Sequence, residues 1–168
     1  LSYYSGQLTA TSGSSSVFGY LNENCWELIR SAYLLQENIG RTPNMEEAEK
    51  TQMKAEAKCL IASTYFNMFR MYGGLPIVKR SFNVGETSHD LPRASVETTV
   101  NFMVDLLDEA SKVLPWTPDD PTSETGRWTK AAAMALKCQI LQFAASQLFN
   151  SDKPYYGSTY SISDSSPV

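Results

Sequence analysis

Residues 55–78, AEAKCLIASTYFNMFRMYGGLPIV, constrain the fold of this chain more than any other segment. Apolar residues recur at helical spacing on two separate faces, and a helix with two apolar faces packs between neighbours instead of lying on a surface. One stripe consists of Met53, Ala57, Leu60, Ile61, Thr64, Met68, Met71 and Tyr72, and the other of Ala55, Cys59, Ala62, Phe66 and Phe69. Gly73 favours the backbone conformation that ends a helix, and Pro76 cannot continue one. The sequence therefore predicts a central helix followed by an extended apolar segment.

Three further segments have helical periodicity, so the predicted fold class is all-α. We expect helices over residues 24–39, 44–72, 95–114 and 129–149, with N-caps at Asn44, Ser95 and Thr129. They would form two antiparallel pairs that resemble tetratricopeptide pairs, although the regular repeat of about 34 residues is absent. We expect five side chains to be almost fully buried: Phe66, Leu60, Leu107, Leu136 and Ile140.

The chain of 168 residues is long enough for one domain with its own core. We expect a loop-rich segment over residues 1–23, a helical domain over 24–150 and a polar tail over 151–168. The first residue is leucine, and neither a signal peptide nor a lipidation cysteine lies near it. We therefore expect the chain to be a fragment of a larger protein, with the tail starting its C-terminal region.

Charge and apolar content exclude two classes of protein. The formal net charge is −4, from 14 basic and 18 acidic residues, and the basic residues form no run. A nucleic-acid-binding surface needs a basic patch, so we expect no nucleic acid as a partner. The longest apolar run is too short to cross a bilayer.

The residues that usually carry catalysis or metal binding form no pattern here. Cys25, Cys59 and Cys138 lie in apolar stripes without metal-ligand spacing, so we expect three buried free thiols, no metal and no cofactor. A Cys59–Cys138 disulfide remains an alternative if the two helices touch. His89 is the only histidine and lies in a polar loop. Without a catalytic constellation, we expect a protein that is not an enzyme.

Three blocks of sequence resemble the SusD/RagB family, the glycan-binding lipoproteins of Gram-negative outer membranes. The first is residues 55–78, with the opening Ala-Glu-Ala-basic and the exit Tyr-Gly-Gly-apolar-Pro-apolar-Val. The second is LPRASVETTVNFMVDLLDEASKVLP, residues 91–115, and the third is GRWTKAAAMALKCQILQFAASQLFN, residues 126–150. The chain departs from the family at Tyr33, where asparagine is usual, and at Gln147, where proline is usual. The resemblance covers the family's N-terminal helical part and implies its tetratricopeptide-like fold.

The resemblance also implies a function. It implies a non-catalytic protein, lipid-anchored on the outward side of the outer membrane, that binds extracellular oligosaccharide or polysaccharide. The bound sugar would pass to a SusC-like, TonB-dependent transporter. The anchor would lie outside this chain. The alternative is a helical-repeat module that binds a protein and no glycan.

A candidate glycan surface lies at the entry to the first helix. Sugars need flat aromatic rings together with amide or charged groups that hydrogen-bond to hydroxyls. The segment before and into the first helix, residues 16–26, has that composition, and the family carries an aromatic platform in the corresponding stretch. We therefore expect glycan contacts from Phe18, Tyr20, Asn22, Asn24 and Trp26.

Overall fold

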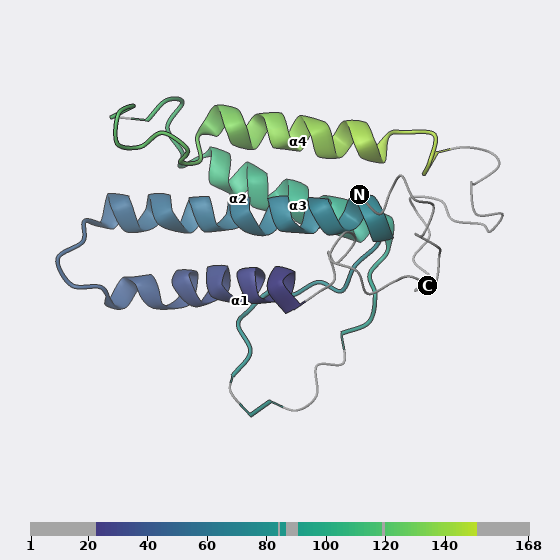
Figure 1. Cartoon of the computed structure of the whole chain (residues 1–168), viewed down its shortest axis with the longest axis horizontal. Coiled ribbons are helices and arrows are strands. Elements are labelled where there is room, and N and C mark those ends of the chain that lie inside the picture. Colours follow the sequence, from purple (N-terminus) through teal and green to yellow (C-terminus); the bar gives the residue numbers. More distant parts are fainter. Residues whose placement is uncertain (1–22, 84, 87–90, 119, 151–168) are drawn as a thin grey trace, which may run out of the picture.

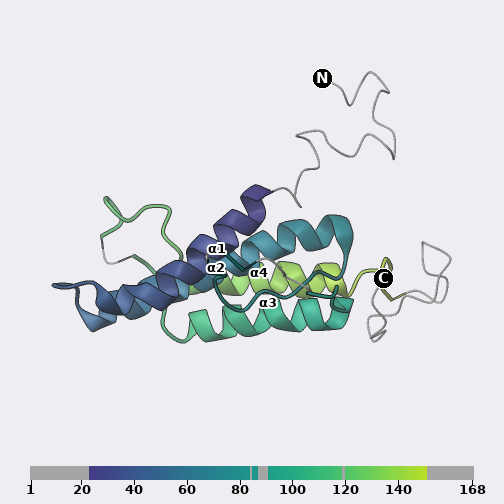
Figure 2. The same ribbon diagram turned by 90° about the horizontal axis from the view of Figure 1, so that it is seen from below.

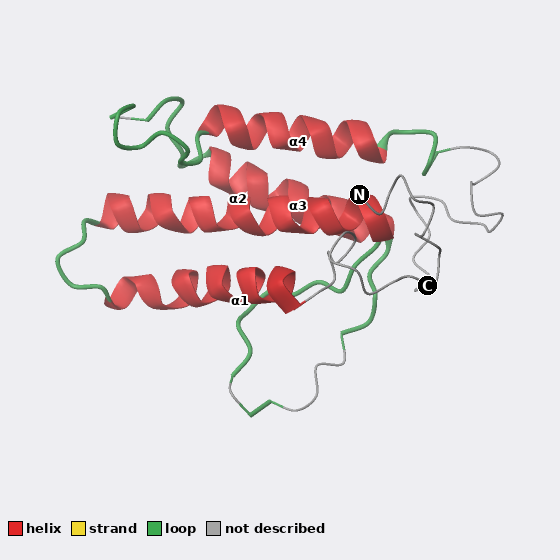
Figure 3. Cartoon of the chain, in the orientation of Figure 1, coloured by secondary structure: helices red, strands yellow, loops and turns green. Residues whose placement is uncertain are grey.

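The computed structural model describes residues 23–83, 85–86, 91–118 and 120–150. These residues form four α-helices and one short 3-10 helix, with no strand among them, which confirms the all-α prediction (Figures 1 and 3). The helices are α1 (Glu23–Asn38), η1 (Ile39–Arg41), α2 (Glu47–Tyr72), α3 (Val96–Ser111) and α4 (Lys130–Ala144).

The long helix α2 lies between α1 and α3, and α4 packs against α3 (Figures 1 and 2). The connections alternate between the two ends of the stack, so consecutive helices run antiparallel. α2 also touches α4, which explains why its sequence carries more than one apolar face. The predicted central position of this helix is confirmed.

The end of α2 is set by the backbone conformation of Gly73, and the segment that follows is fixed by hydrogen bonds to buried hydroxyl groups. Gly73 adopts φ 72°, and its N–H donates to the carbonyl of Phe69 at 2.9 Å, which ends the helix. The following segment runs antiparallel to the residues before α3, through a bridge between Pro76 and Arg93. Thr99 on α3 accepts a hydrogen bond from the N–H of Leu75 at 3.1 Å. The predicted extended segment, residues 74–78, is therefore packed across the end of the stack, and we call it the strap.

Two tyrosine hydroxyls form hydrogen bonds with the backbone of the strap. The Tyr65 hydroxyl accepts from the N–H of Val78 at 2.8 Å and donates to the carbonyl of Pro76 at 2.9 Å. The Tyr33 hydroxyl donates to the carbonyl of Val78 at 2.9 Å. Burial raises the pKa of Tyr33 to about 12 and also raises the pKa of Tyr65, so both hydroxyls keep their protons at neutral pH. Tyr33, where the resembled family usually has asparagine, therefore anchors α1 to the strap.

Tyr65→Phe should lower the free energy of unfolding by about 1–3 kcal/mol, because it removes the acceptor of a buried backbone N–H. Urea denaturation followed by circular dichroism measures this loss. Tyr33→Phe is the matched control: it removes one donor from a carbonyl and should cost only about 0.5–1.5 kcal/mol. Equal stability of Tyr65→Phe and the parent would mean that water replaces the hydroxyl.

Two recognised blocks of sequence are joined by an ion pair. The Arg127 guanidinium, just before α4, lies 2.8 Å from the carboxylate of Glu56 on α2, and Glu124 pairs with its other side at 2.8 Å. Glu56 belongs to the Ala-Glu-Ala opening of the first block and Arg127 to the Gly-Arg opening of the third. The pair fixes the loop before α4 against the middle of the stack.

The caps at Ser95 and Thr129 are confirmed, and the cap at Asn44 is wrong. The Ser95 hydroxyl accepts from Thr98 N–H and the Thr129 hydroxyl from Ala132 N–H. Asn44 has φ 61° and lies before the helix, which begins at Glu47 with Glu46 as an N-cap that makes no side-chain bond. Asparagine tolerates the left-handed conformation, so it forms the turn instead of the cap.

Two helices end earlier than predicted. α3 ends at Ser111 instead of 114, since Val113 and Leu114 turn back to bond the carbonyl of Ala110 ahead of Pro115. α4 ends at Ala144 instead of 149. There the Asn150 side-chain amide donates to the carbonyls of Ala144 and Ser146, and the chain folds back.

Three of the five predicted core residues are buried, and two are not. Phe66, Leu107 and Ile140 are buried as predicted. Leu60 is 42% exposed, and Leu136 is half-buried, so these two predictions were wrong. The first predicted apolar stripe includes residues that are not buried. α1 and α3 pack on either side of α2, so the part of its surface around Leu60 and Met71 faces outward.

The cysteine predictions also hold in part. All three thiols are free, so no Cys59–Cys138 disulfide forms. Cys59 is fully buried and Cys25 is half-buried, but Cys138 is exposed and was wrongly predicted to be inside. Its position on α4 points away from α3, the main neighbour of that helix. Burial raises the pKa of the Cys59 thiol to about 12, which makes it unreactive.

Candidate functional site

A hollow of about 380 Å³ lies where α1, the end of α2 and the strap meet. Its lining combines two aromatic rings, apolar strap residues and one guanidinium: Trp26, Tyr72, Gly74, Leu75, Pro76 and Arg93. The aromatic rings come from different helices, Trp26 from α1 and Tyr72 from the last turn of α2. The hollow therefore exists only because the chain stops α2 at this point and brings the strap back beneath α1.

The walls of this hollow are held by contacts beneath them. Trp26 is half-buried, and its ring meets the buried Tyr65 ring edge-on, with centroids 6.1 Å apart. The Arg93 guanidinium donates from Nε to the carbonyl of Gly74 at 2.6 Å and from Nη2 to the carbonyl of Tyr72. These carbonyls lie at the end of α2, where the helix dipole favours a cation. Arg93 is thereby fixed in place along the wall.

This arrangement suits the binding of an uncharged polar ring better than acid–base chemistry. Half-exposed aromatic and proline surfaces can pack against the C–H faces of a sugar, and a guanidinium donates to hydroxyl groups. None of the described residues that line the hollow carries a carboxylate. Glycoside hydrolysis needs two carboxyl groups across the scissile bond, so this lining lacks that machinery.

The structure separates the predicted glycan contacts. Phe18, Tyr20 and Asn22 lie outside the described residues. Asn24 is exposed on α1, whereas Trp26 faces the core and lines the hollow. Two residues apart on a helix point in different directions, so Asn24 and Trp26 do not share one surface.

Tyr72 and Arg93 line the hollow, although neither was predicted from the sequence as a site residue. Both stand inside recognised blocks, Tyr72 in the Tyr-Gly-Gly exit and Arg93 in Leu-Pro-Arg. Their separation of twenty-one positions along the chain hid their proximity. The signal that could have linked them is the connection between α2 and α3, whose two ends must lie close together for α3 to pack against α2.

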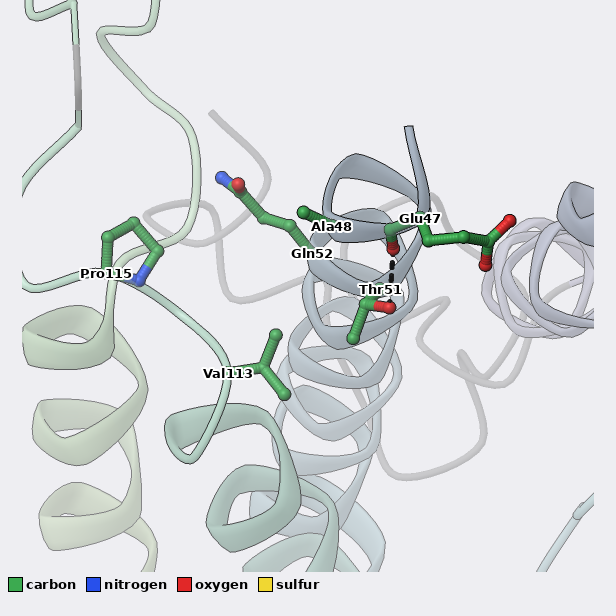
Figure 4. Close-up of a pocket in the computed structure, with 6 residues that line it drawn as sticks. All are labelled: Glu47, Ala48, Thr51, Gln52, Val113 and Pro115. Carbon is green, nitrogen blue, oxygen red and sulfur yellow. Dashed lines mark hydrogen bonds between the residues drawn. The ribbon is translucent and has the colours of Figure 1, made fainter. Parts of the chain in front are cut away.

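A second hollow, of about 450 Å³, lies at the opposite end of α2 (Figure 4). It is lined by Glu47, Ala48, Thr51, Gln52, Val113 and Pro115. Figure 4 shows the Glu47 carboxylate turned away from Val113 and Pro115. That carboxylate pairs with Lys50 at 2.8 Å instead. With no aromatic ring in its lining, this hollow offers no stacking surface for a sugar.

The two hollows are too far apart to form one compact site. Ala48 lines one and Tyr72 the other, and a rise of 1.5 Å per helical residue puts them roughly 36 Å apart. Trp116, which is 60% exposed, follows Pro115 and so stands at the end of the stack away from Trp26. It provides a control position for tests of the first hollow.

Two features are absent from the described part of the chain: a cluster of metal-ligating side chains and a helix able to span a membrane. That part contains no group of three histidine, cysteine, aspartate or glutamate residues placed to hold a metal ion. None of its helices is both long and apolar enough to span a membrane.

Comparison with known proteins decides the family. Residues 4–141 match the family model SusD-like_3, described as starch-binding and associating with the outer membrane. The chain belongs to the SusD-like family. Because the match covers most of the chain, it includes all three blocks at least in part, and the resemblance seen in the sequence is confirmed.

Several SusD-like relatives share this sequence and fold. SusD-like protein P38 of Formosa agariphila is 28% identical over 115 residues, which cover 68% of this chain and 21% of that protein. The solved structure of BT4246 superposes with a TM-score of 0.71 at 32% identity, covering 79% of this chain and 22% of that one. A laminarin-binding SusD-like protein superposes with a TM-score of 0.64 at 25% identity, covering 84% of this chain and 31% of that one.

The relatives place the chain within a larger architecture. It spans about a fifth of the length of SusD-like protein P38 and of BT4246, so it corresponds to a fragment of them. The SusD-like family is a carbohydrate-binding family associated with the outer membrane. Within this chain, several residues of the three blocks build the strap and the ion pair between blocks, and those residues support the fold.

Proposed function

We propose that this chain is part of a non-catalytic protein that captures oligosaccharide at the outer-membrane surface, where a lipid anchor outside these residues would hold it. The captured sugar would then pass to a SusC-like, TonB-dependent transporter. The family match and a laminarin-binding relative support the carbohydrate part of this proposal. The observation that carries it within the chain is the hollow in which Trp26, Tyr72 and Arg93 converge.

The proposed surface includes this hollow and the predicted contacts that precede α1 in the sequence. Phe18, Tyr20 and Asn22 precede Trp26 by eight, six and four positions. We propose that they complete the aromatic platform, with Asn24 outside the contact area because it lies on another side of α1. Sugars exchange hydrogen bonds with water for hydrogen bonds with protein, which nets only about 0.5–1.5 kcal/mol for each bond. Ring stacking must therefore supply most of the preference.

Affinity for a fitting oligosaccharide should lie in the micromolar to millimolar range, on the order of −4 to −8 kcal/mol. Calorimetry with laminarin- and starch-derived oligosaccharides measures it. Trp26→Ala should weaken binding at least several-fold, and Trp26→Phe should retain most of it because an aromatic ring still packs on Tyr65. Sugar should also change the fluorescence of the parent and leave that of Trp26→Phe less affected.

Trp116→Ala is the matched control, since it removes the same side chain at the other end of the stack. Its affinity and that of Asn24→Ala should equal that of the parent. Parent-like affinity in Trp26→Ala and Tyr20→Ala would exclude this surface as the site. Failure of every oligosaccharide to bind the parent, with peptide binding in its place, would favour a helical-repeat interaction module.

A further inference from the structure

The hollow beside Trp26 carries positive charge in its wall. Arg93 is the one charged residue among those that line it. Its Nε and Nη2 atoms donate to the carbonyls of Gly74 and Tyr72, whereas Nη1 makes no hydrogen bond to any residue that the structure describes. The carbonyls at the end of a helix offset only about half a unit of positive charge. Arg93 therefore contributes residual positive charge to the hollow.

Arg30 extends this charge along α1. It follows Trp26 by four residues, so it lies one turn further along the same side of the helix, about 6 Å away along the axis. That side faces the strap, because Tyr33, three residues further on, bonds the carbonyl of Val78. Arg30 is exposed, and no described carboxylate forms an ion pair with it.

Lys79 supplies a third cation, directly after the strap. It follows Pro76 by three residues, which places their backbones no more than about 10 Å apart. Val78 is buried, and successive side chains of an extended segment point to opposite sides, so the exposed Lys79 points outward. Among the described residues it has no ion-pair partner, whereas its neighbour Arg80 pairs with Glu86 at 3.0 Å.

We call these three side chains the basic rim: Arg30, Lys79 and Arg93. Two carboxylates of α1 do not cancel its charge. Glu37 accepts a hydrogen bond from the N–H of Ser81 at 2.9 Å, and Glu27 directly follows Trp26, so it points to another side of the helix. The chain as a whole has a net charge of −4 and repels anions, so an anionic ligand needs cations gathered at its point of contact.

A basic rim beside an aromatic hollow suits an acidic oligosaccharide. A guanidinium group donates paired hydrogen bonds to a carboxylate or a similar oxyanion, and such charge-assisted bonds are roughly twice as strong as neutral ones. The aromatic and proline surfaces of the hollow suit the uncharged face of a sugar ring. A sugar held there would bring its neighbour in the oligosaccharide to Arg30 and Lys79.

We propose that this site selects oligosaccharides that carry an anionic group, a carboxylate or a sulfate, on the sugar next to the one held in the hollow. The aromatic rings bind the sugar face, and the basic rim binds the anion. This proposal rests on the proposed function, because it requires a sugar in the hollow. It also goes further, since binding of a neutral glycan needs no basic rim.

Matched ligands test this selection by calorimetry on the protein expressed from its complete gene. Each set contains a laminarin- or starch-derived hexasaccharide, the same sugar with primary hydroxyls oxidised to carboxylates, and the same sugar with sulfate esters. At least one anionic form should bind about three- to tenfold more tightly than the neutral form at about 20 mM NaCl. The preference should disappear at about 500 mM NaCl, because salt screens exposed charges. The two anionic arms distinguish carboxylate from sulfate.

Charge-removing variants locate the preference. The double variant Arg30→Gln, Lys79→Gln should lose most of it and keep the affinity for the neutral sugar within about twofold. The double variant Arg41→Gln, Lys112→Gln is the matched control, because it removes the same two charges at the other end of the stack and should keep the full preference. Arg93 stays in place in both, since its bonds hold the wall of the hollow.

Three results would overturn the proposal. These are equal or weaker binding of both anionic forms, a preference that survives in the Arg30, Lys79 variant, and a preference that falls equally in the control. In each case, binding of the neutral sugar would leave the proposed function standing. If no sugar of any form binds, the proposed function fails together with this selection.

Discussion

Gly74→Ala should destabilise the protein by about 3 kcal/mol or more, the larger end of what overpacking produces. A Cβ atom at this position would lie 2.1 Å from the carbonyl oxygen of Ala94 and 3.1 Å from the carbonyl carbon of Ser95. Both are backbone atoms, so no side chain can rotate away to make room. The strap and the start of α3 would have to separate, which breaks the hydrogen bond from Leu75 to Thr99. Urea denaturation measures the loss.

Gly40→Ala is the matched control for this substitution. A Cβ atom at Gly40 meets nothing within 4 Å, and its backbone is not in the left-handed region. This variant should fall between no change and a gain of about 1 kcal/mol, because alanine reduces the freedom of the unfolded chain. If Gly74→Ala unfolds at the same urea concentration as Gly40→Ala, the close approach of the strap to α3 does not exist.

Phe69→Ala should cost on the order of 3–5 kcal/mol, as truncation of a buried aromatic side chain does. Phe69 is fully buried, stacks on Phe149 at 5.3 Å between centroids and meets Phe143 at 5.9 Å. Its loss leaves a cavity where α2, α4 and the turn after α4 converge. The measurement is chemical denaturation followed by circular dichroism.

Leu60→Ala is the control for Phe69→Ala, because it truncates a large apolar side chain on the same helix that is exposed instead of buried. Leu60 stands on the same helix as Phe69 and was predicted to be buried, yet it is 42% exposed. Its truncation should cost less than about 1 kcal/mol. A large loss for Leu60→Ala would mean that another element covers that sector of α2, and a small loss for Phe69→Ala would contradict the aromatic cluster at the end of the stack.

Helix existence was predictable because periodicity and caps are local. The apolar spacing of α2 and α3, the serine and threonine caps and the double glycine each act within a few residues. The predicted N-cap at Asn44 was wrong for a local reason too, since asparagine is favoured both at N-caps and in left-handed turns. Helix ends moved by several residues where later residues, such as Asn150, captured the terminal carbonyls.

The candidate site was predictable only in part. Composition selected Trp26, which lines the hollow, but it grouped Asn24 with Trp26 although the two point in different directions from α1. Tyr72 and Arg93 entered the hollow because the strap folds back, an event that depends on the hydroxyls of Tyr65 and Thr99. No spacing rule links residues that meet through a loop.

The sequence by itself determined the family, the helices and the central place of α2, because these follow from local patterns of residue type. The tertiary structure alone decided which apolar faces have neighbours. Cys138 and Leu141 satisfy the same periodicity as buried residues, yet both are exposed because no described helix lies beyond α4. Periodicity states that a face is apolar, and only the packing of other elements determines whether that face meets protein or water.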